Sequence, residues 1–147
     1  MKESGRSRNP MKILITGANG MLGFALGRVM KEYELTGLGI GDRGDFPGTF
    51  TPVDITDRAA LSARVRESRP DLISHAAAMT DVDRCEKEPQ ESDRINVEGT
   101  RNVAEALRGT RAGLIFISTD FVFDGKKNSL YTAGDVPNAV SAYGRSK

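Results

Sequence analysis

Three glycines near the start of the chain constrain its fold more than any other feature. Gly17, Gly20 and Gly23 follow an apolar run at residues 12–16 and open a segment, residues 20–33, with the pattern of a helix. In such a strand–turn–helix unit the first glycine permits the tight turn, the second lets backbone approach a pyrophosphate, and the third lets the helix pack against the strand. Thr16 and Asn19 can hold the turn through side-chain hydrogen bonds. The sequence therefore predicts a βαβ unit that binds a dinucleotide.

Apolar runs alternate with helical patterns along the rest of the chain. The expected strands are residues 12–16, 35–40, 51–53, 71–75 and 113–118, and the expected helices are residues 20–33, 57–68 and 89–108. Strands separated by helices favour a parallel sheet covered on both faces. Gly99 lies in the apolar stripe of the last helix and indicates a close approach of helix to sheet. The expected fold class is α/β, a Rossmann-type doubly wound parallel sheet truncated after the fifth strand.

Composition limits the number of domains and the classes of partner. The 147 residues suffice for one domain, and 21 basic against 20 acidic side chains give no electrostatic case for nucleic acid or an anionic membrane. No apolar run approaches the ~20 residues of a membrane-spanning helix, and the single cysteine, Cys85, cannot form an internal disulfide. We expect a cytoplasmic protein with a disordered extension at residues 1–10 and a dinucleotide-binding domain at residues 11–147.

Two further segments lie where strands of such a sheet end. Asp42 and Arg43 follow the second strand, where an acid can accept a hydrogen bond from a ribose 2′-hydroxyl and an arginine can pair with a 2′-phosphate. The sequence offers both, so the choice between NADH and NADPH stays open, and at least one of the two is a solvated loop charge. Ala76, Ala77 and Ala78 follow the fourth strand, where small residues either let backbone lie against a flat ligand or simply pack tightly.

A tyrosine and a lysine near residue 147 suggest acid–base chemistry. Tyr143 and Lys147 are four residues apart, so on a helix they share a face, and the ammonium then favours the phenolate that a carbonyl–alcohol catalyst uses. Ser118 and Thr119 place hydroxyls after the fifth strand, within reach of a substrate oxygen. Taken alone, Ser118 and Thr119 are explained as residues that cap a strand, and Lys147 is explained as a surface charge. Combined with the glycine turn, they favour nicotinamide-dependent oxidoreduction.

The single histidine and the single cysteine are interpreted as structural residues. His75 is the one histidine and has no partner for a metal site or a catalytic triad, so no metal is expected, and we place it at a strand end beneath the cofactor. Cys85 has no second cysteine and is interpreted as a helix-packing residue.

Three motifs resemble the dTDP-4-dehydrorhamnose reductase family, within the extended branch of the short-chain dehydrogenase/reductase superfamily. They are the Gly-x-x-Gly-x-x-Gly turn, the segment AAAMTDVDRCE at residues 76–86, and STDFVFDG at residues 118–125 followed by YGRSK at residues 143–147. The resemblance runs from Met11 to Lys147. Phe121 stands where the family more often has tyrosine.

The resemblance implies an NADPH- or NADH-dependent reductase with a nucleotide-sugar substrate. Thr119 would polarise the substrate, Tyr143 would donate the proton, and Lys147 would hold the nicotinamide ribose. Asp54 falls where the family has an aspartate near the adenine ring, although a helix cap is an alternative role. The implied cofactor residues are Gly17, Asn19, Gly20, Met21, Leu22, Gly23, Asp42, Arg43, Asp54, Ile55, Ala76, Ala77, Ala78, Tyr143 and Lys147, and the implied substrate residues are Thr80, Asp81, Val82 and Thr119.

The expected reaction reduces the 4-keto group of dTDP-4-dehydro-6-deoxy-L-mannose to give dTDP-L-rhamnose. One alternative is another nucleotide-sugar epimerase or dehydratase of the extended family, against which the STDFVFDG segment argues. Another is a non-catalytic cofactor-binding subunit like the β subunit of methionine adenosyltransferase, against which the retained Thr119, Tyr143 and Lys147 argue. Asn96 matches a helix asparagine that supports the active site in the wider superfamily, or else faces the sheet. We expect the 147 residues alone to lack activity as an incomplete domain without the carboxyl-terminal substrate-binding part, and the full-length protein to be a candidate homodimer.

Overall fold

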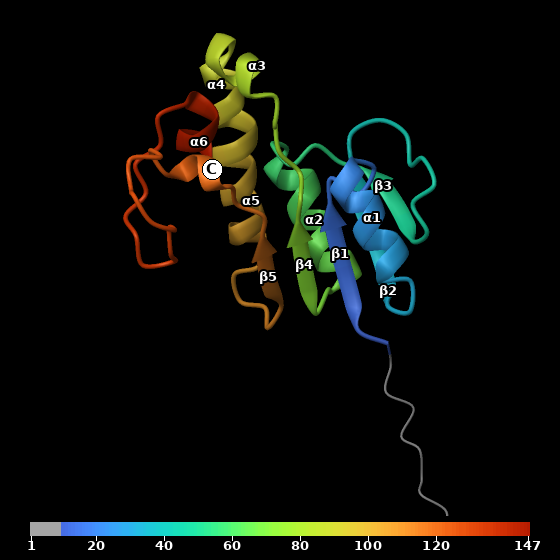
Figure 1. Ribbon diagram of the computed structural model, residues 1–147. Coiled ribbons are helices and arrows are strands. Elements are labelled where there is room, and N and C mark those ends of the chain that lie inside the picture. The colour runs from blue at the N-terminus through green and yellow to red at the C-terminus, as the bar shows by residue number, and fades with distance from the viewer. Residues whose placement is uncertain (1–9) are drawn as a thin grey trace, which may run out of the picture.

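A computed structural model describes residues 10–147 as a single five-stranded parallel sheet flanked by helices (Figure 1). Residues 1–9, which make up nearly all of the expected disordered extension, lie outside the described part. The strands are β1 (Lys12–Thr16), β2 (Glu34–Gly39), β3 (Thr49–Pro52), β4 (Leu72–His75) and β5 (Gly113–Phe116). They lie in the order β3-β2-β1-β4-β5, and every neighbouring pair is parallel.

The strand order identifies where a ligand can bind. From β1 the chain winds first toward β2 and β3 and then, on the other side, toward β4 and β5. The loops after β1 and β4 therefore leave the sheet toward opposite faces, and the crevice at their carboxyl ends is the position at which doubly wound sheets bind ligands. In the register of β1 and β4, Thr16 stands opposite His75 at this edge. The sequence-based prediction of fold class is confirmed.

Helices cover the two faces of the sheet with alternate residues of the same strands. On one face α1 (Met21–Val29) packs over Ile13 and Ile15 of β1, together with the buried ring of Phe46. The helices α2 (Arg58–Ser68) and α5 (Gly99–Ala106) lie on the other face (Figure 1). There they cover Leu14. This alternation follows from the two-residue period of a strand.

The chain between β4 and β5 departs from the single helix expected at residues 89–108. It forms α3 (Val82–Lys87), which was not predicted, then α4 (Pro89–Asp93), a π-helical turn η1 (Arg94–Glu98) and α5. Asp81 caps α3 by accepting a hydrogen bond from the Arg84 N–H at 2.9 Å. Pro89 separates α3 from α4 because proline has no N–H to donate and restricts the residue before it.

Element ends account for the other differences from the sequence-based expectation. The first helix ends at Val29 rather than residue 33, because the chain turns through a hydrogen bond from the Tyr33 N–H to the Met30 carbonyl. Strand β5 ends at Phe116, so Ser118 and Thr119 belong to the following loop. A 3-10 turn η2 (Asp120–Val122) and the short α6 (Ala142–Ser146) complete the described chain. Within residues 10–147 no helix is long and apolar enough to cross a membrane.

Candidate functional site

The glycine turn after β1 is closed so tightly that side chains would not fit. Gly17 has a φ of 68°, and a Cβ on it would lie 2.8 Å from the Cα of Ala77. Its carbonyl accepts a hydrogen bond from the Gly20 N–H at 2.9 Å. A Cβ on Gly23 would lie 2.1 Å from the Gly17 oxygen, so the third glycine lets α1 pack on the turn itself rather than on the strand. The backbone is thereby left open toward the sheet edge.

Asn19 fastens this turn to the end of the neighbouring strand. Its amide nitrogen Nδ2 donates to the carbonyls of Ile40 at 2.7 Å and Asp42 at 2.9 Å. Gly39 makes room for it, because a Cβ there would lie 2.2 Å from Asn19 Oδ1. Thr16, expected to hold the turn, instead bonds to the segment after β4, where its hydroxyl accepts from the Ala77 N–H at 3.3 Å.

A cleft of about 390 Å³ runs along the carboxyl edge from the glycine turn to the loop after β3. Eight of the residues expected to contact the cofactor line it: Gly17, Asn19, Gly20, Asp54, Ile55, Ala76, Ala77 and Ala78. Gly39, Ile40, Val53, Met79, Arg84, Glu91, Arg94 and Ile95 complete its walls. Met21 and Leu22 are 92% and 43% exposed and do not line it, because the start of α1 turns their side chains outward. The cleft is thus walled by the turn on one side and by α3 and η1 on the other.

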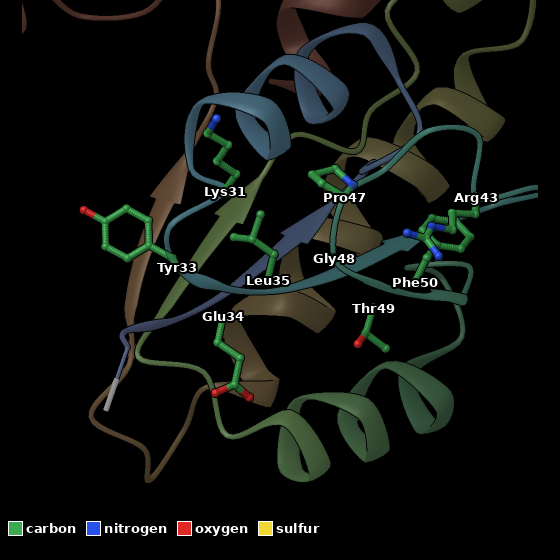
Figure 2. A pocket seen from close by; sticks show the side chains of 9 residues that line it. All are labelled: Lys31, Tyr33, Glu34, Leu35, Arg43, Pro47, Gly48, Thr49 and Phe50. Atoms are coloured by element: carbon green, nitrogen blue, oxygen red, sulfur yellow. The ribbon is translucent and has the colours of Figure 1, made fainter. Parts of the chain in front are cut away.

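Neither Asp42 nor Arg43 contributes a side chain to this cleft. Arg43 turns back on its own loop, where Nε donates to the Phe46 carbonyl at 2.8 Å. It lines a separate hollow at the β3 edge together with Lys31 and Glu34, as Figure 2 shows. Asp42 is held through its main-chain oxygen by Asn19. The structure therefore does not bring the two charges that could distinguish NADH from NADPH to the cleft wall.

The loop after β3 places Asp54 at the cleft and gives the helix cap to another residue. Asp54 Oδ1 accepts from the Thr56 N–H at 2.9 Å, whereas Asp57 caps α2 by accepting from the Ala60 N–H at 3.0 Å. The capping alternative for Asp54 is wrong. Ile55 is buried beneath the loop, and a Cβ on Gly99 would lie 2.5 Å from its Cδ1. The close approach that Gly99 permits is therefore to this loop and not to a strand.

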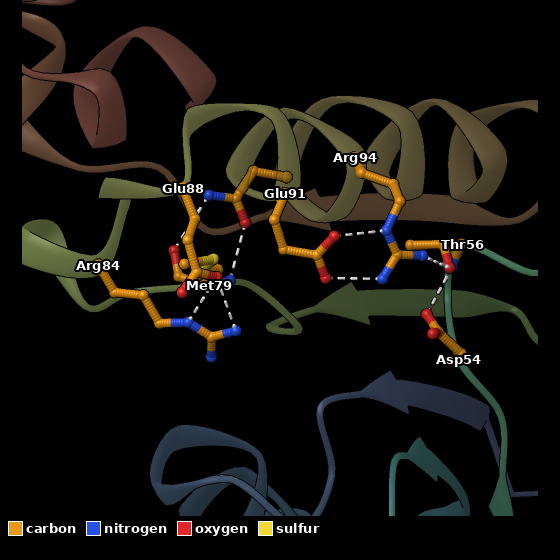
Figure 3. A network of polar contacts seen from close by, with 8 residues as sticks. Asp54, Thr56, Met79, Arg84, Glu88, Glu91 and Arg94 are labelled. Atoms are coloured by element: carbon orange, nitrogen blue, oxygen red, sulfur yellow. Dashed lines mark hydrogen bonds and ion pairs between the residues drawn. The ribbon is translucent and has the colours of Figure 1, made fainter. Parts of the chain in front are cut away.

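Charged side chains from α3, α4 and η1 form a network at the mouth of the cleft (Figure 3). Arg94 makes two bonds of 2.7 Å to the carboxylate of Glu91, and its Nη1 donates to the Thr56 hydroxyl at 2.5 Å. Arg84 pairs with Glu88. Sequence reasoning missed these residues, since pairs three and four apart on a helix look like ordinary solvated ion pairs.

Asn96 organises the segment between the cleft and α6. It is 2% exposed, its Oδ1 accepts from the Met79 N–H at 2.8 Å, and its Nδ2 donates to the Met79 carbonyl and to Ser146 Oγ at 3.0 and 2.9 Å. Ser146 Oγ in turn donates to the Tyr143 carbonyl at 2.8 Å. The π-helical turn that carries Asn96 is a geometry common at functional sites. Asn96 thus connects the end of β4 to α6 instead of facing the sheet alone.

The three expected catalytic residues gather around Phe121 and the end of β5. Phe121 donates its N–H to Thr119 Oγ1 at 3.3 Å, and its ring meets Tyr143 edge-on with centroids 5.8 Å apart. The Lys147 ammonium lies over the Phe116 ring, 4.7 Å from its centroid, and burial lowers its pKa. Thr119 also donates to Asp120 at 3.3 Å. The three side chains share this edge without direct bonds between them.

The expected substrate residues Thr80, Asp81 and Val82 lie at the start of α3. Thr80 and Asp81 are exposed, and Asp81 is occupied as the α3 cap. Cys85, on the same helix, is fully buried against Met79 and Ala142, which agrees with a packing role. Among residues 10–147 no group of three or more His, Cys, Asp or Glu side chains is placed to hold a metal ion.

His75 is buried between two threonines at the sheet edge. Its Nδ1 lies 2.6 Å from Thr16 Oγ1 and its Nε2 lies 2.9 Å from Thr100 Oγ1. Burial and, to a smaller extent, the charge of Lys147 lower its pKa from 6.5 to about 4. The ring is therefore neutral at pH 7 and locks β1, β4 and α5 together.

Acidification is expected to destabilise the fold through this histidine. Because the pKa is depressed in the folded state, the unfolded chain takes up a proton first, so the stabilisation present above pH 6.5 is lost as the pH falls from about 6.5 to about 4. In urea unfolding, the free energy of unfolding should fall between pH 7 and pH 4.5. The fall should be larger by about 2 kcal/mol in the wild type than in His75→Gln. No other histidine titrates in this range. An equal loss in both proteins would contradict this role.

The comparison with known proteins decides the family. Residues 11–147 match the family described as the RmlD substrate binding domain. The chain belongs to this family. Its relatives include the dTDP-4-dehydrorhamnose reductase of Sinorhizobium fredii, 36% identical over 138 residues, and the methionine adenosyltransferase 2 subunit beta of Xenopus tropicalis, 36% identical over 136 residues. These alignments cover 93% and 92% of the chain but 43% and 40% of the relatives, so the chain spans less than half their length.

A solved relative supports the same assignment in three dimensions. The structure of dTDP-4-dehydrorhamnose reductase from Bacillus anthracis in complex with NADP is similar with a TM-score of 0.81 and 37% identity. The similarity covers 93% of the chain and 46% of that protein. The prediction of the reductase family from the glycine turn and the motifs at residues 76–86, 118–125 and 143–147 is confirmed.

Proposed function

We propose that the chain is the dinucleotide-binding part of an NAD(P)H-dependent oxidoreductase that reduces dTDP-4-dehydrorhamnose to dTDP-L-rhamnose. The observation that carries the proposal is the cleft at the carboxyl edge, whose turn has no room for side chains at Gly17 and Gly23 and leaves the backbone of Gly20 exposed where a pyrophosphate would approach. The NADP-bound relative from Bacillus anthracis supports the choice of ligand. Residues 11–147 would form an incomplete domain, completed by the segment that relatives carry beyond this length.

The cleft residues divide the work of holding the cofactor. The amides of Gly20 and the first turn of α1 would face the pyrophosphate, where the positive end of the helix dipole favours negative charge. Asp54 and Ile55 would contact the adenine, and the carbonyls and small side chains of Ala76–78 would lie along the ribose and nicotinamide. When bound, the nicotinamide supplies hydride to the carbonyl carbon of the substrate.

The residues near Phe121 and the end of β5 would then carry out the proton transfer. Tyr143 donates its phenolic proton to the oxygen of the reduced carbonyl, and the Thr119 hydroxyl orients that oxygen. Lys147, desolvated over Phe116, stabilises the phenolate that remains and holds the ribose. Thr80, Asp81 and Val82, at the start of α3, would line the substrate side. The Thr80 hydroxyl is exposed there, where a nucleotide-sugar would enter, whereas the Asp81 carboxylate caps α3.

The proposal is tested in two steps. The chain should bind NADPH or NADH saturably in a titration followed by nicotinamide fluorescence. A chimaera that joins residues 1–147 to the remainder of the Sinorhizobium fredii reductase should then oxidise the bound cofactor when dTDP-4-dehydrorhamnose is added. A chimaera that binds the cofactor but does not consume it with this sugar would contradict the reductase assignment. Interconversion of a UDP-hexose and its 4-epimer with NAD+ bound, and no net change in the cofactor, would instead favour an epimerase-like enzyme.

A regulatory role is the second candidate, favoured by the relatives named methionine adenosyltransferase 2 subunit beta. In that case the chain would bind the cofactor and a catalytic methionine adenosyltransferase subunit without consuming a sugar. Co-elution with such a subunit in size-exclusion chromatography, together with an inactive chimaera, would support this function over the reductase.

A further inference from the structure

The wall of the cleft opposite the glycine turn is bridged by one side chain. Arg94 begins the π-helical turn η1, and its guanidinium reaches the loop after β3, where it donates to Thr56 Oγ1 at 2.5 Å. Glu91, one turn earlier, fixes the orientation of the guanidinium with two bonds of 2.7 Å. Figure 3 shows the resulting line of contacts from Glu91 through Arg94 and Thr56 to Asp54. Two segments separated by 38 residues are thereby joined within this wall of the cleft.

The loop that Arg94 reaches carries the residues expected at the adenine. Thr56 is the residue whose N–H bonds to Asp54 Oδ1 at 2.9 Å, so a displacement of Thr56 also moves the Asp54 carboxylate. From below, Asn102 of α5 donates to the Ile55 carbonyl at 3.0 Å. The loop is thus held from two sides, by a buried amide beneath it and by Arg94 at the mouth of the cleft.

We propose that Arg94 is a positioning residue for the adenosine half of the dinucleotide, acting through Thr56 on the Asp54–Ile55 loop. The inference rests on the proposed cofactor binding and adds a residue to it. A loop fixed before binding loses less conformational entropy on binding. The Arg94–Thr56 bond therefore raises affinity without touching the ligand's phosphates. Its effect belongs to the adenine end, because Arg94 bonds to Thr56 in the Asp54–Ile55 loop and its other side-chain bonds go to Glu91, not to the alanines that follow β4.

A purely electrostatic role predicts a different pattern. The cleft wall also contains Arg84, which pairs with Glu88 and makes no bond to the loop after β3. If positive charge near an anionic ligand were the whole effect, losing either arginine would weaken all phosphate-bearing ligands alike. If the Arg94–Thr56 bond matters, Thr56→Val should lower the affinity as much as the replacement of Arg94 does, although it changes no charge.

The test uses the 147-residue chain and competition for bound NADPH by AMP and by nicotinamide mononucleotide, which carry the same phosphate charge. We expect Arg94→Gln and Thr56→Val each to weaken the binding of AMP about threefold to fivefold, because exposed bonds of this kind contribute modestly. The binding of nicotinamide mononucleotide should hardly change. The double variant should be no weaker than either single one, because both remove the same bond. Arg84→Gln, the control, should show no preference between the two competitors.

Two results would overturn the inference while leaving the proposed function intact. One is wild-type affinity for AMP in Thr56→Val, and the other is an equal loss of both mononucleotides in Arg94→Gln. Failure of the wild-type chain to bind NADPH would instead remove the proposed function and the inference with it. Equal unfolding midpoints for the wild type and Thr56→Val establish that any change in affinity does not come from partial unfolding.

Discussion

Replacing Gly23 by alanine is expected to abolish dinucleotide binding and to lower the free energy of unfolding by about 3 kcal/mol. The new Cβ would lie 2.1 Å from the Gly17 oxygen and 2.7 Å from the Ala18 Cα, and both neighbours are backbone atoms that cannot rotate away. Either α1 moves off the turn or the turn opens, and both changes displace the Gly20 amide from the cleft. Urea unfolding and an NADPH titration measure the two effects.

Gly134 provides a matched control for this substitution. It has an ordinary φ, and a Cβ on it would meet only Thr132 Oγ1, at 3.9 Å. Gly134→Ala should therefore change the unfolding free energy by no more than about 0.5 kcal/mol and leave binding unchanged. Near-normal NADPH affinity in Gly23→Ala would show that the tight turn is not the pyrophosphate site.

Tyr143→Phe in the chimaera with the Sinorhizobium fredii remainder is expected to lower the rate of dTDP-4-dehydrorhamnose reduction about 100-fold or more, as general acids typically contribute. The substitution keeps the ring that packs edge-on against Phe121 and removes only the proposed proton donor. NADPH affinity should stay within about twofold, because the cleft at the glycine turn is untouched.

Tyr33→Phe is the control for the loss of a phenol. Tyr33 lines the hollow at the β3 edge together with Lys31 and Arg43, apart from the cleft residues (Figure 2). Its replacement should leave both rate and affinity unchanged. A Tyr143→Phe chimaera that reduces the sugar at the wild-type rate would assign the proton transfer to another group.

Patterns of local origin were the ones that the sequence predicted well. All five strands appear within two residues at each end, because apolar runs bounded by glycine, proline and charged residues determine buried parallel strands directly. The glycine turn was also predictable, since Gly17 needs a positive φ and Gly23 a close approach. The strands and the glycine turn depend on steric limits that a few neighbouring residues set without help from the rest of the chain.

Features that depend on which partner a polar side chain or helix meets were not predictable, whether that partner lies near or far along the chain. The direction of Arg43 is decided by the Phe46 carbonyl, and the reach of Arg94 by Thr56, 38 residues away. The division of the long helix into α4, η1 and α5 brings Asn96 to Met79 and Ser146, contacts that no periodicity of the sequence encodes. Asp54 and Asp57 are equally good cap residues by type, and only the turn through Thr56 assigns the cap to Asp57.

The most direct measurement is a backbone-amide NMR titration of the 15N-labelled chain with NADP+. The account predicts large, saturable shift changes at Gly17, Gly20, Asp54 and Ala76–78, with none at Lys31 or Thr49 in the hollow beside Arg43. Changes confined to that hollow, or no changes at millimolar NADP+, would contradict the assignment of the cleft as a dinucleotide site.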